Sequence, residues 1–297
     1  MPTHELAALL ASLCFAVAGL LAVVPSRTLG AVRFNRVRML FMAVVLFVLA
    51  SLTGGLDSLV LQSLPLLILS GLVGIFLGDT FLFAALRRVG PRRNAIMFAL
   101  NAPLSVIAGI YFLDEMLSFL ILCGCLTVTA GVTIALIFGP GRFGVSSWDK
   151  LHGSLPVGLL YGFLAATGQA AGIILTRPLM DQGIDPIAAA AVRVTAGGIA
   201  LFVAFEFMQR KSVRDHSVWT RQILFLTLGS GIIGMGFGMT LVLYGLSGGQ
   251  AGIISTLSSA APIFMIPVLW IASRQLPVFG SWTGALIVFL GTAMIMV

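Results

Sequence analysis

The sequence predicts an all-α integral membrane protein with ten transmembrane helices, arranged as two inverted five-helix repeats. Three observations support this prediction: a hydrophobic composition, an internal repeat, and loop charges that reverse between the two copies. Of the 297 residues, 59% are hydrophobic and only 9% are charged, and the mean hydropathy is +1.10. Soluble domains are far more polar, so the long apolar runs are interpreted as membrane-spanning segments.

Ten apolar runs are long enough to cross a bilayer, which takes roughly 20 residues per helix. They are expected at about 5–25, 36–54, 62–86, 91–112, 117–138, 153–176, 185–208, 221–245, 250–272 and 277–297. The first run lacks a basic start and a small-residue cleavage site, so we expect it to be retained. The runs divide the chain into a first repeat at 1–138, a cytoplasmic connection at 139–152 and a second repeat at 153–297.

The internal repeat is visible in small residues that recur 160 positions later in the same order. The matched pairs are Gly74 and Gly234, Gly78 and Gly238, Thr80 and Thr240, Gly124 and Gly284, and Gly131 and Gly291. Gly90 and the pair Ala102-Pro103 recur at an offset of 159, as Gly249 and Ala261-Pro262. A fixed period of this kind indicates two related units, and two-half membrane proteins with a site at the seam are typical secondary transporters.

The loop charges predict the orientation. Connections after the odd-numbered runs carry most of the basic residues: Arg27, Arg33, Arg36, Arg87, Arg88, Arg92, Arg93, Arg142, Lys150, Arg210, Lys211, Arg214, Arg221 and Arg274. The other connections carry one arginine and five acidic residues: Arg177, Asp57, Asp114, Glu115, Asp181 and Asp185. By the positive-inside rule the basic connections are cytoplasmic and both termini lie outside. Five helices per copy is an odd number, so the second copy is expected to be inverted.

A family resemblance rests on the stretch from Gly74 through Asn101-Ala102-Pro103 to Asp114-Glu115-Met116-Leu117-Ser118, and on its second copy from Gly234 through Ala260-Ala261-Pro262 to Gly291. These segments resemble the drug/metabolite transporter superfamily, in particular its ten-helix members with EamA-type repeats. Arg38 and Arg193, early in the second helix of each repeat, also fit that pattern. The chain is most similar to the amino-acid exporters, including the aromatic amino acid exporter. The resemblance implies export of aromatic or small neutral amino acids across a bacterial inner membrane by alternating access.

Two prolines are expected to break the fourth and ninth helices. Pro103 and Pro262 lie near the middle of these helices, and each proline frees the carbonyl group four residues earlier, at Ala99 and Ser258. A backbone carbonyl group without its helical partner is tolerated at membrane depth only where it is buried in protein or lines a water-filled cavity. One interpretation makes the prolines hinges beside a substrate site; the other gives them a role in helix packing alone.

Polar side chains at mid-depth are the candidate substrate site, because burying them in the membrane is costly. Asp79 and Arg193 each lie about 12 Å deep, from opposite faces, and are predicted to be near enough to pair. Asp79 is a candidate proton site or gate, and Arg193 a candidate anchor for a substrate carboxylate; a structural ion pair or backbone clamp remains the alternative. The neutral candidates are Thr80, Asn101, Ser105, Tyr161, Gln169, Thr240, Tyr244, Ser258 and Ser259. Asn101 offers two donors and an acceptor, and its match in the second repeat is Ala260, so the site is expected to be asymmetric.

Three further features are expected to be structural. Glycines four residues apart predict close helix packing at Gly74/Gly78, Gly168/Gly172 and Gly234/Gly238. Arg38 is expected to lie near the cytoplasmic boundary and to extend its charge to the water there. The pair Asp114-Glu115, matched by Ser273-Arg274 in the second repeat, is expected to follow membrane orientation alone.

No catalytic or nucleotide-binding motif is present, so neither an enzyme nor a cofactor is expected. Cys14, Cys123 and Cys125 lie in apolar runs without the spacing of a metal site. Transport would then run on a gradient, as uniport or with weak proton coupling. The expected partners are a small-molecule substrate and membrane lipid, without nucleic acid, and the expected state is a monomer. A carrier of drug-like cations or nucleotide sugars, and a membrane scaffold or sensor without flux, remain as alternatives.

Overall fold

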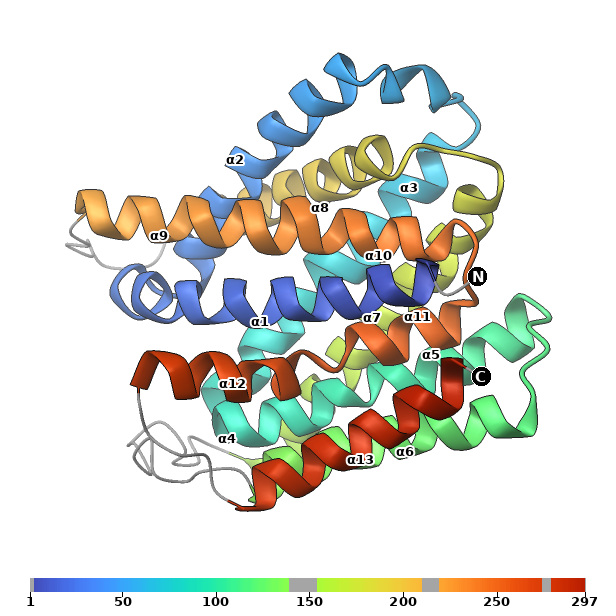
Figure 1. Cartoon of the computed structure of the whole chain (residues 1–297). Coiled ribbons are helices and arrows are strands. Elements are labelled where there is room, and N and C mark those ends of the chain that lie inside the picture. Colours follow the sequence, from blue (N-terminus) through green and yellow to red (C-terminus); the bar gives the residue numbers. More distant parts are fainter. Residues whose placement is uncertain (1–2, 139–153, 210–218, 274–278, 297) are drawn as a thin grey trace.

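The computed structural model describes residues 3–138, 154–209, 219–273 and 279–296, and within these ranges the chain forms helices and no strand (Figure 1). Eight helical segments in these ranges are long and apolar enough to span a membrane. Two shorter apolar helices, Ala251–Pro267 and Trp282–Met296, complete the set. The prediction of an all-α membrane protein with ten helical segments is therefore confirmed.

The first repeat supplies the first five membrane segments. Its helices are α1 (Thr3–Leu29), α2 (Ala31–Leu52), the 3₁₀ turn η1 (Gly55–Ser58), α3 (Leu64–Ser70), the π-helical segment η2 (Gly71–Leu77), α4 (Gly78–Ala99), α5 (Asn101–Phe112) and α6 (Phe119–Phe138). The third membrane segment consists of α3, η2 and the start of α4, and the fourth consists of the end of α4 and α5.

The second repeat follows the same order of elements. Its helices are α7 (Leu155–Asp181), α8 (Pro186–Gln209), α9 (Arg221–Gly231), the π-helical segment η4 (Ile232–Gly238), α10 (Met239–Leu246), α11 (Ala251–Ser258), α12 (Ala261–Ser273) and α13 (Phe279–Met296). The π-helical segments η2 and η4 fall at matching places in the third helix of each repeat. This local irregularity therefore belongs to the repeated unit.

The predicted breaks are present in both repeats. In the fourth membrane segment α4 ends at Ala99 and α5 begins at Asn101; in the ninth, α11 ends at Ser258 and α12 begins at Ala261. Each break falls just before a proline, Pro103 or Pro262, which cannot donate to the carbonyl group four residues earlier. The prolines thus divide both helices at matching positions.

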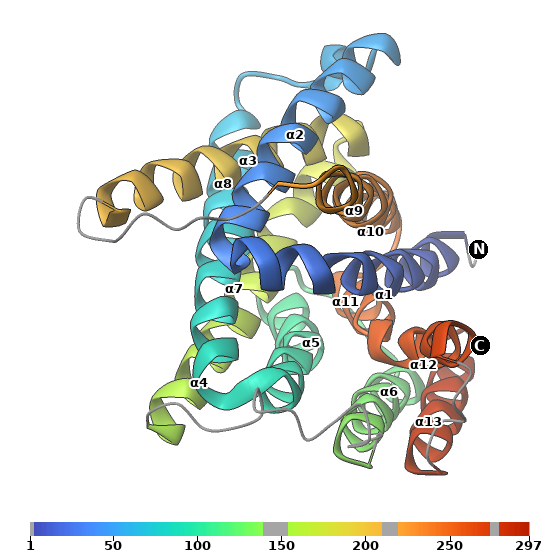
Figure 2. The same cartoon turned by 90° about the vertical axis from the view of Figure 1, so that its left-hand side faces the viewer.

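One boundary differs from the expectation. Residues 87–90 were predicted as a connection, but α4 continues as a helix from Gly78 to Ala99. Figure 2 shows α4 descending along the bundle and then turning towards α5. A helical turn satisfies its own backbone hydrogen bonds, which favours it over an open loop beside the membrane.

The inversion of the repeats is seen where α6 and α13 pack side by side (Figure 1). A Cβ added to Gly124 would lie 2.9 Å from the Gly291 carbonyl oxygen, and one added to Gly131 would lie 2.9 Å from the Gly284 oxygen. Gly124 matches Gly284 in the repeat, and Gly131 matches Gly291, so each contact is the two-fold image of the other. Two-fold contacts between antiparallel helices are what an inverted repeat requires.

Both ends of the described chain lie at the same end of the bundle, on the right of Figure 1, together with the α5–α6 and α10–α11 connections. We call this the terminal end. The opposite end holds the α1–α2 connection, the turn of α4 and the start of α9, where the arginines gather in the sequence. We call it the basic end.

Candidate substrate site

The two helix breaks are joined by a buried polar cluster. Asn101 is the first residue of α5 and is only 4% exposed. Its Oδ1 accepts hydrogen bonds from Ser259 Oγ at 2.9 Å and from Ser255 Oγ at 3.1 Å. Its Nδ2 donates to the Phe98 carbonyl oxygen at 3.0 Å. A single amide therefore connects the first repeat, through α5, with the second repeat, through α11.

The serines of this cluster also bond to the backbone beside the break. Ser259 Oγ donates to the Ser255 carbonyl oxygen at 2.7 Å, and Ser258 Oγ donates to the same oxygen at 3.1 Å. The Ser255 oxygen also accepts the Ser259 backbone N–H at 3.0 Å, and the single hydroxyl hydrogen of Ser259 is shared between this oxygen and Asn101 Oδ1. The predicted residues Asn101, Ser258 and Ser259 are thus brought together, each with a defined partner.

Two polar groups in or beside the cluster have no hydrogen-bond partner within the described ranges. Asn101 has two N–H donors and uses one of them within the described ranges. Ser105 lies one helical turn further along α5, is fully buried, and its Oγ has no hydrogen-bond partner there. Positions four residues apart lie on the same face of a helix. Unsatisfied buried polar atoms cost free energy, so these two groups are available to a polar ligand.

The space beside the cluster is narrow in this conformation. A gap bounded by α5, α6 and α11 is lined by Ala99, Ala102, Val128, Thr129, Val132, Thr256 and Ser259, and it does not admit a water molecule. The lining is apolar except for Thr129, Thr256 and Ser259. A ligand reaching Asn101 therefore requires the helices to separate.

Asp79 belongs to a different network from the predicted one. Asn35 Nδ2 donates to Asp79 Oδ2 at 2.9 Å, and an Arg38 guanidinium nitrogen donates to Asn35 Oδ1 at 2.7 Å. The predicted pairing of Asp79 with Arg193 is wrong, because α2 of the same repeat supplies the partner. The expectation for Arg38 is also wrong: its guanidinium turns inward to Asn35, and its stem packs against Gly231 of α9.

Arg193 lies beside the glycine crossing, where α7 packs against η2 through Gly172 and Gly74. It is 3% exposed, and Cβ atoms added to Gly172 and Gly74 would lie 3.3 Å and 3.5 Å from its guanidinium nitrogen. Its Nε has no hydrogen-bond partner, and no carboxylate pairs with it within the described ranges. The predicted close packing is confirmed here, since Gly168 and Gly172 of α7 lie directly against the backbone around Gly74 and Gly78. Glycines leave the room that the buried guanidinium occupies.

The remaining predicted residues lie outside the cluster. Thr80 bonds to its own helix at the Phe76 carbonyl oxygen, and the ring of Tyr161 stacks on Phe81 with 5.9 Å between the ring centroids. Tyr244 is 44% exposed at the terminal end and stacks on His4. Gln169 and Thr240 are half-buried and make no side-chain hydrogen bond in the part of the chain that the structure describes.

A large groove on the described surface lies elsewhere. It measures about 730 Å³ and runs between α2, α3 with η2, and α8. It is lined by apolar side chains such as Phe47, Phe76 and Val203, with Thr195 as the one polar exception. None of the predicted site residues lines it, and its chemistry suits hydrocarbon rather than a charged solute.

The sequence interpretation missed two polar residues. Asn35 holds Asp79, and its signal was its place three residues before Arg38, on one helix face. Glu115 was expected to follow membrane orientation alone, but its carboxylate accepts hydrogen bonds from the backbone of α11. The sequence carried no signal for Glu115, because its partners are backbone N–H groups that lie 136 and 137 residues further along the chain.

Comparison with known proteins places this geometry in a wider group. The profile of the EamA-like transporter family matches residues 3–137 and again residues 156–297. A solved structure titled "Crystal structure of protein" has a TM-score of 0.75 with this chain, at 18% sequence identity. The match covers 99% of this chain and 96% of that one, and at this identity it shows the fold alone. Among curated proteins, none matches the chain.

Proposed function

The chain belongs to the EamA-like transporter family, and from this premise we propose that it exports aromatic or small neutral amino acids by alternating access. The observation that carries the proposal is the spare polar capacity at the paired helix breaks. The free N–H of Asn101 suits a substrate carboxylate, and the unpartnered hydroxyl of Ser105 suits either end of a zwitterion.

The surroundings of the cluster also support a small substrate with an apolar side chain. Val128 and Val132 of α6 line the gap beside Asn101. Within the described ranges, no group of three His, Cys, Asp or Glu side chains is placed to hold a metal ion. Recognition is therefore proposed to use neutral hydrogen bonds and apolar contact, with Arg193 as a second anchor that becomes accessible when α7 and η2 separate.

The proposal includes the cellular setting. The carrier is placed in a bacterial inner membrane, as a monomer surrounded by lipid, with both termini outside and the basic end in the cytoplasm. It acts as a uniporter or with weak proton coupling, in which Asp79 is the candidate proton site. The repeats are proposed to divide at the connection 139–152, which lies outside the described residues.

A scaffold or sensor without flux is the second candidate, and one observation favours it. The gap beside Asn101 is too narrow for water in this conformation, as expected of a filled centre. A carrier also passes through closed states, so flux separates the two candidates. A cation carrier is disfavoured, because the buried guanidinium of Arg193 has no carboxylate partner within the described ranges and would repel a cation that came near it.

The deciding experiment measures uptake of labelled phenylalanine and alanine into liposomes that contain the purified protein. We expect saturable uptake that Asn101→Ala reduces at least about tenfold in kcat/KM, the scale of one lost hydrogen bond to a charged carboxylate. Thr127→Val is the matched control, since within the described ranges the Thr127 hydroxyl bonds to its own helix, at the Cys123 carbonyl oxygen. Absence of amino-acid flux from protein that is folded and monodisperse would overturn the substrate assignment.

A further inference from the structure

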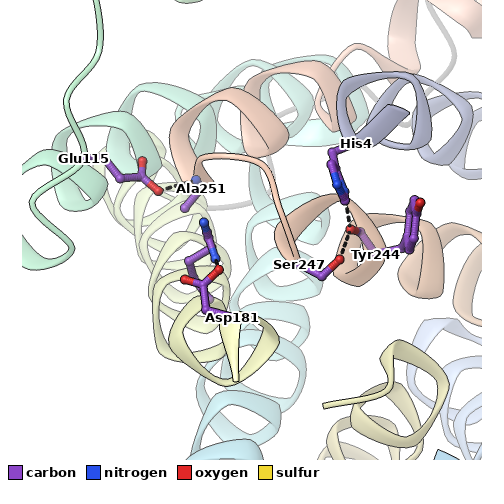
Figure 3. Close-up of polar contacts among 7 residues, drawn as sticks. His4, Glu115, Asp181, Tyr244, Ser247 and Ala251 are labelled. Atoms are coloured by element: carbon purple, nitrogen blue, oxygen red, sulfur yellow. Dashed lines mark hydrogen bonds and ion pairs between the residues drawn. The ribbon is translucent and has the colours of Figure 1, made fainter. Parts of the chain in front are cut away.

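The terminal end of the bundle is closed by contacts that cross between the repeats. Glu115, in the α5–α6 connection, is 9% exposed, and its carboxylate accepts a hydrogen bond from the backbone N–H of Ala251 (Figure 3). It also accepts one from the N–H of Gly252 at 3.3 Å. Gln250 Nε2 donates in return to the Met116 carbonyl oxygen at 3.1 Å. A residue of the first repeat thus caps the first turn of α11 in the second repeat.

The cap occupies a place where α11 lacks a cap of its own. Gln250 precedes the helix and makes no side-chain bond to it. The first amide groups of a helix have no partner within the helix, and a carboxylate is the group that they bind best. In contrast, the ion pair of Arg177 with Asp181 in Figure 3 lies within α7 and joins nothing across the repeats.

The contact between the broken helices of the two repeats is tight at the terminal end of the bundle and loose towards the basic end. At the terminal end, residues 251–257 of α11 are all buried, and a Cβ added to Gly252 would lie 2.9 Å from Val106 Cα in α5. Towards the basic end, residues 261–266 of α12 are partly exposed, and Figure 2 shows α12 well apart from α4. In the repeat α5 corresponds to α12, and the end of α4 corresponds to α11. The two-fold counterpart of the α5–α11 contact would therefore be a contact between α12 and α4. The structure is therefore closed at the terminal end.

We propose that Glu115 is the latch that holds the terminal end closed, a positioning residue whose release from α11 permits the opposite conformation. This inference rests on the proposed function as an alternating-access carrier. Charge-assisted hydrogen bonds to two amide groups stabilise the closed state. When α11 moves away, water solvates both the carboxylate and the amide groups, so the release is reversible. The neighbouring contact of His4 Nδ1 with the Tyr244 carbonyl oxygen, 3.0 Å long, also joins α1 to the second repeat at this end.

The test measures the distance across the closed end by pulsed electron spin resonance. Spin labels are placed at Met116→Cys and Ser247→Cys after Cys14, Cys123 and Cys125 have been replaced by alanine. Glu115→Gln removes the charge and one acceptor oxygen, and we expect it to raise the population of longer distances about tenfold. Asp114→Asn is the matched control, since Asp114 is exposed and no hydrogen bond or ion pair joins its side chain to α11 within the described ranges.

A second variant removes the same bond from its other side. Ala251→Pro deletes an N–H that Glu115 accepts, at the first position of a helix, where proline is tolerated. The backbone of Gln250 is already extended, with ψ 139°, as the residue before a proline requires. We expect Ala251→Pro to give the same shift as Glu115→Gln, and it decides the question if Glu115→Gln does not fold.

Unchanged distances in both variants, or an equal shift in Asp114→Asn, would overturn the latch. The readout does not depend on the substrate. A shift to longer distances without amino-acid flux would support the latch and overturn the substrate assignment. Flux with unchanged distances would support the substrate assignment and overturn the latch.

Discussion

Asn35 and Asp79 are joined by a hydrogen bond of 2.9 Å that ties α2 to the start of α4. No equivalent bond occurs among the residues of the second repeat that the structure describes. At the offset of the repeat Asp79 is matched by Met239, and the residue three positions before Arg193 is Ala190, whereas Asn35 precedes Arg38. The two repeats share a backbone plan but differ in charge at this level, so the two halves of a transport cycle need not be equivalent.

Replacing Asp79 tests whether this network carries a proton. Asp79→Asn removes the charge beside Arg38, and we expect lower stability by about 1.5–3 kcal/mol, the range for hydrogen bonds to charged groups. We also expect any stimulation of flux by a pH gradient to disappear. The swap Asn35→Asp with Asp79→Asn restores one amide and one carboxylate and should recover the melting temperature. Gradient stimulation that survives in Asp79→Asn would assign the proton to another group.

The contact of α6 with α13 predicts a strong effect of one methyl group. In Gly131→Ala the new Cβ would lie 2.8 Å from the Val288 backbone nitrogen, so the helices must move apart. Overpacking of this kind costs about 1–3 kcal/mol. Gly229→Ala is the control, since its nearest neighbour is a Leu21 side-chain atom at 3.7 Å. Thermal unfolding in detergent should separate the two variants, and equal melting temperatures would contradict the tight crossing.

Much of this architecture could be predicted from the sequence because it depends on local rules. Matched glycines marked the repeat, and Pro103 and Pro262 marked the breaks, since a proline acts on its own helix. The partners of buried charges could not be predicted in the same way. Position along a helix gives depth in the membrane, and equal depth suggested that Asp79 meets Arg193. Depth is only one of three coordinates. The lateral packing of the helices places Asn35, not Arg193, within hydrogen-bond distance of Asp79.

Arg193 provides a test of the second proposed anchor. The side chain is buried, and no carboxylate in the described part of the chain pairs with it, so Arg193→Met should preserve the fold. If the guanidinium binds the substrate carboxylate after the crossing opens, KM for an amino acid should rise at least about tenfold, as expected for a lost charged hydrogen bond. KM for the corresponding amine, which lacks the carboxylate, should stay the same. A KM unchanged for both would identify Arg193 as a clamp on the glycine crossing.

The membrane orientation is the last prediction, and it can be tested with two cysteines. Leu61 is 83% exposed at the terminal end, and Trp219 is 43% exposed beside the start of α9 at the basic end. The arginines of the basic end favour the cytoplasm, because basic loops are retained there during insertion. In intact cells an impermeant maleimide should label Leu61→Cys, and it should label Trp219→Cys only after the membrane is permeabilised. The native cysteines lie in apolar helices, and the unsubstituted protein shows their background. The opposite labelling pattern would place both termini in the cytoplasm, and the Glu115 latch would then close the inner end.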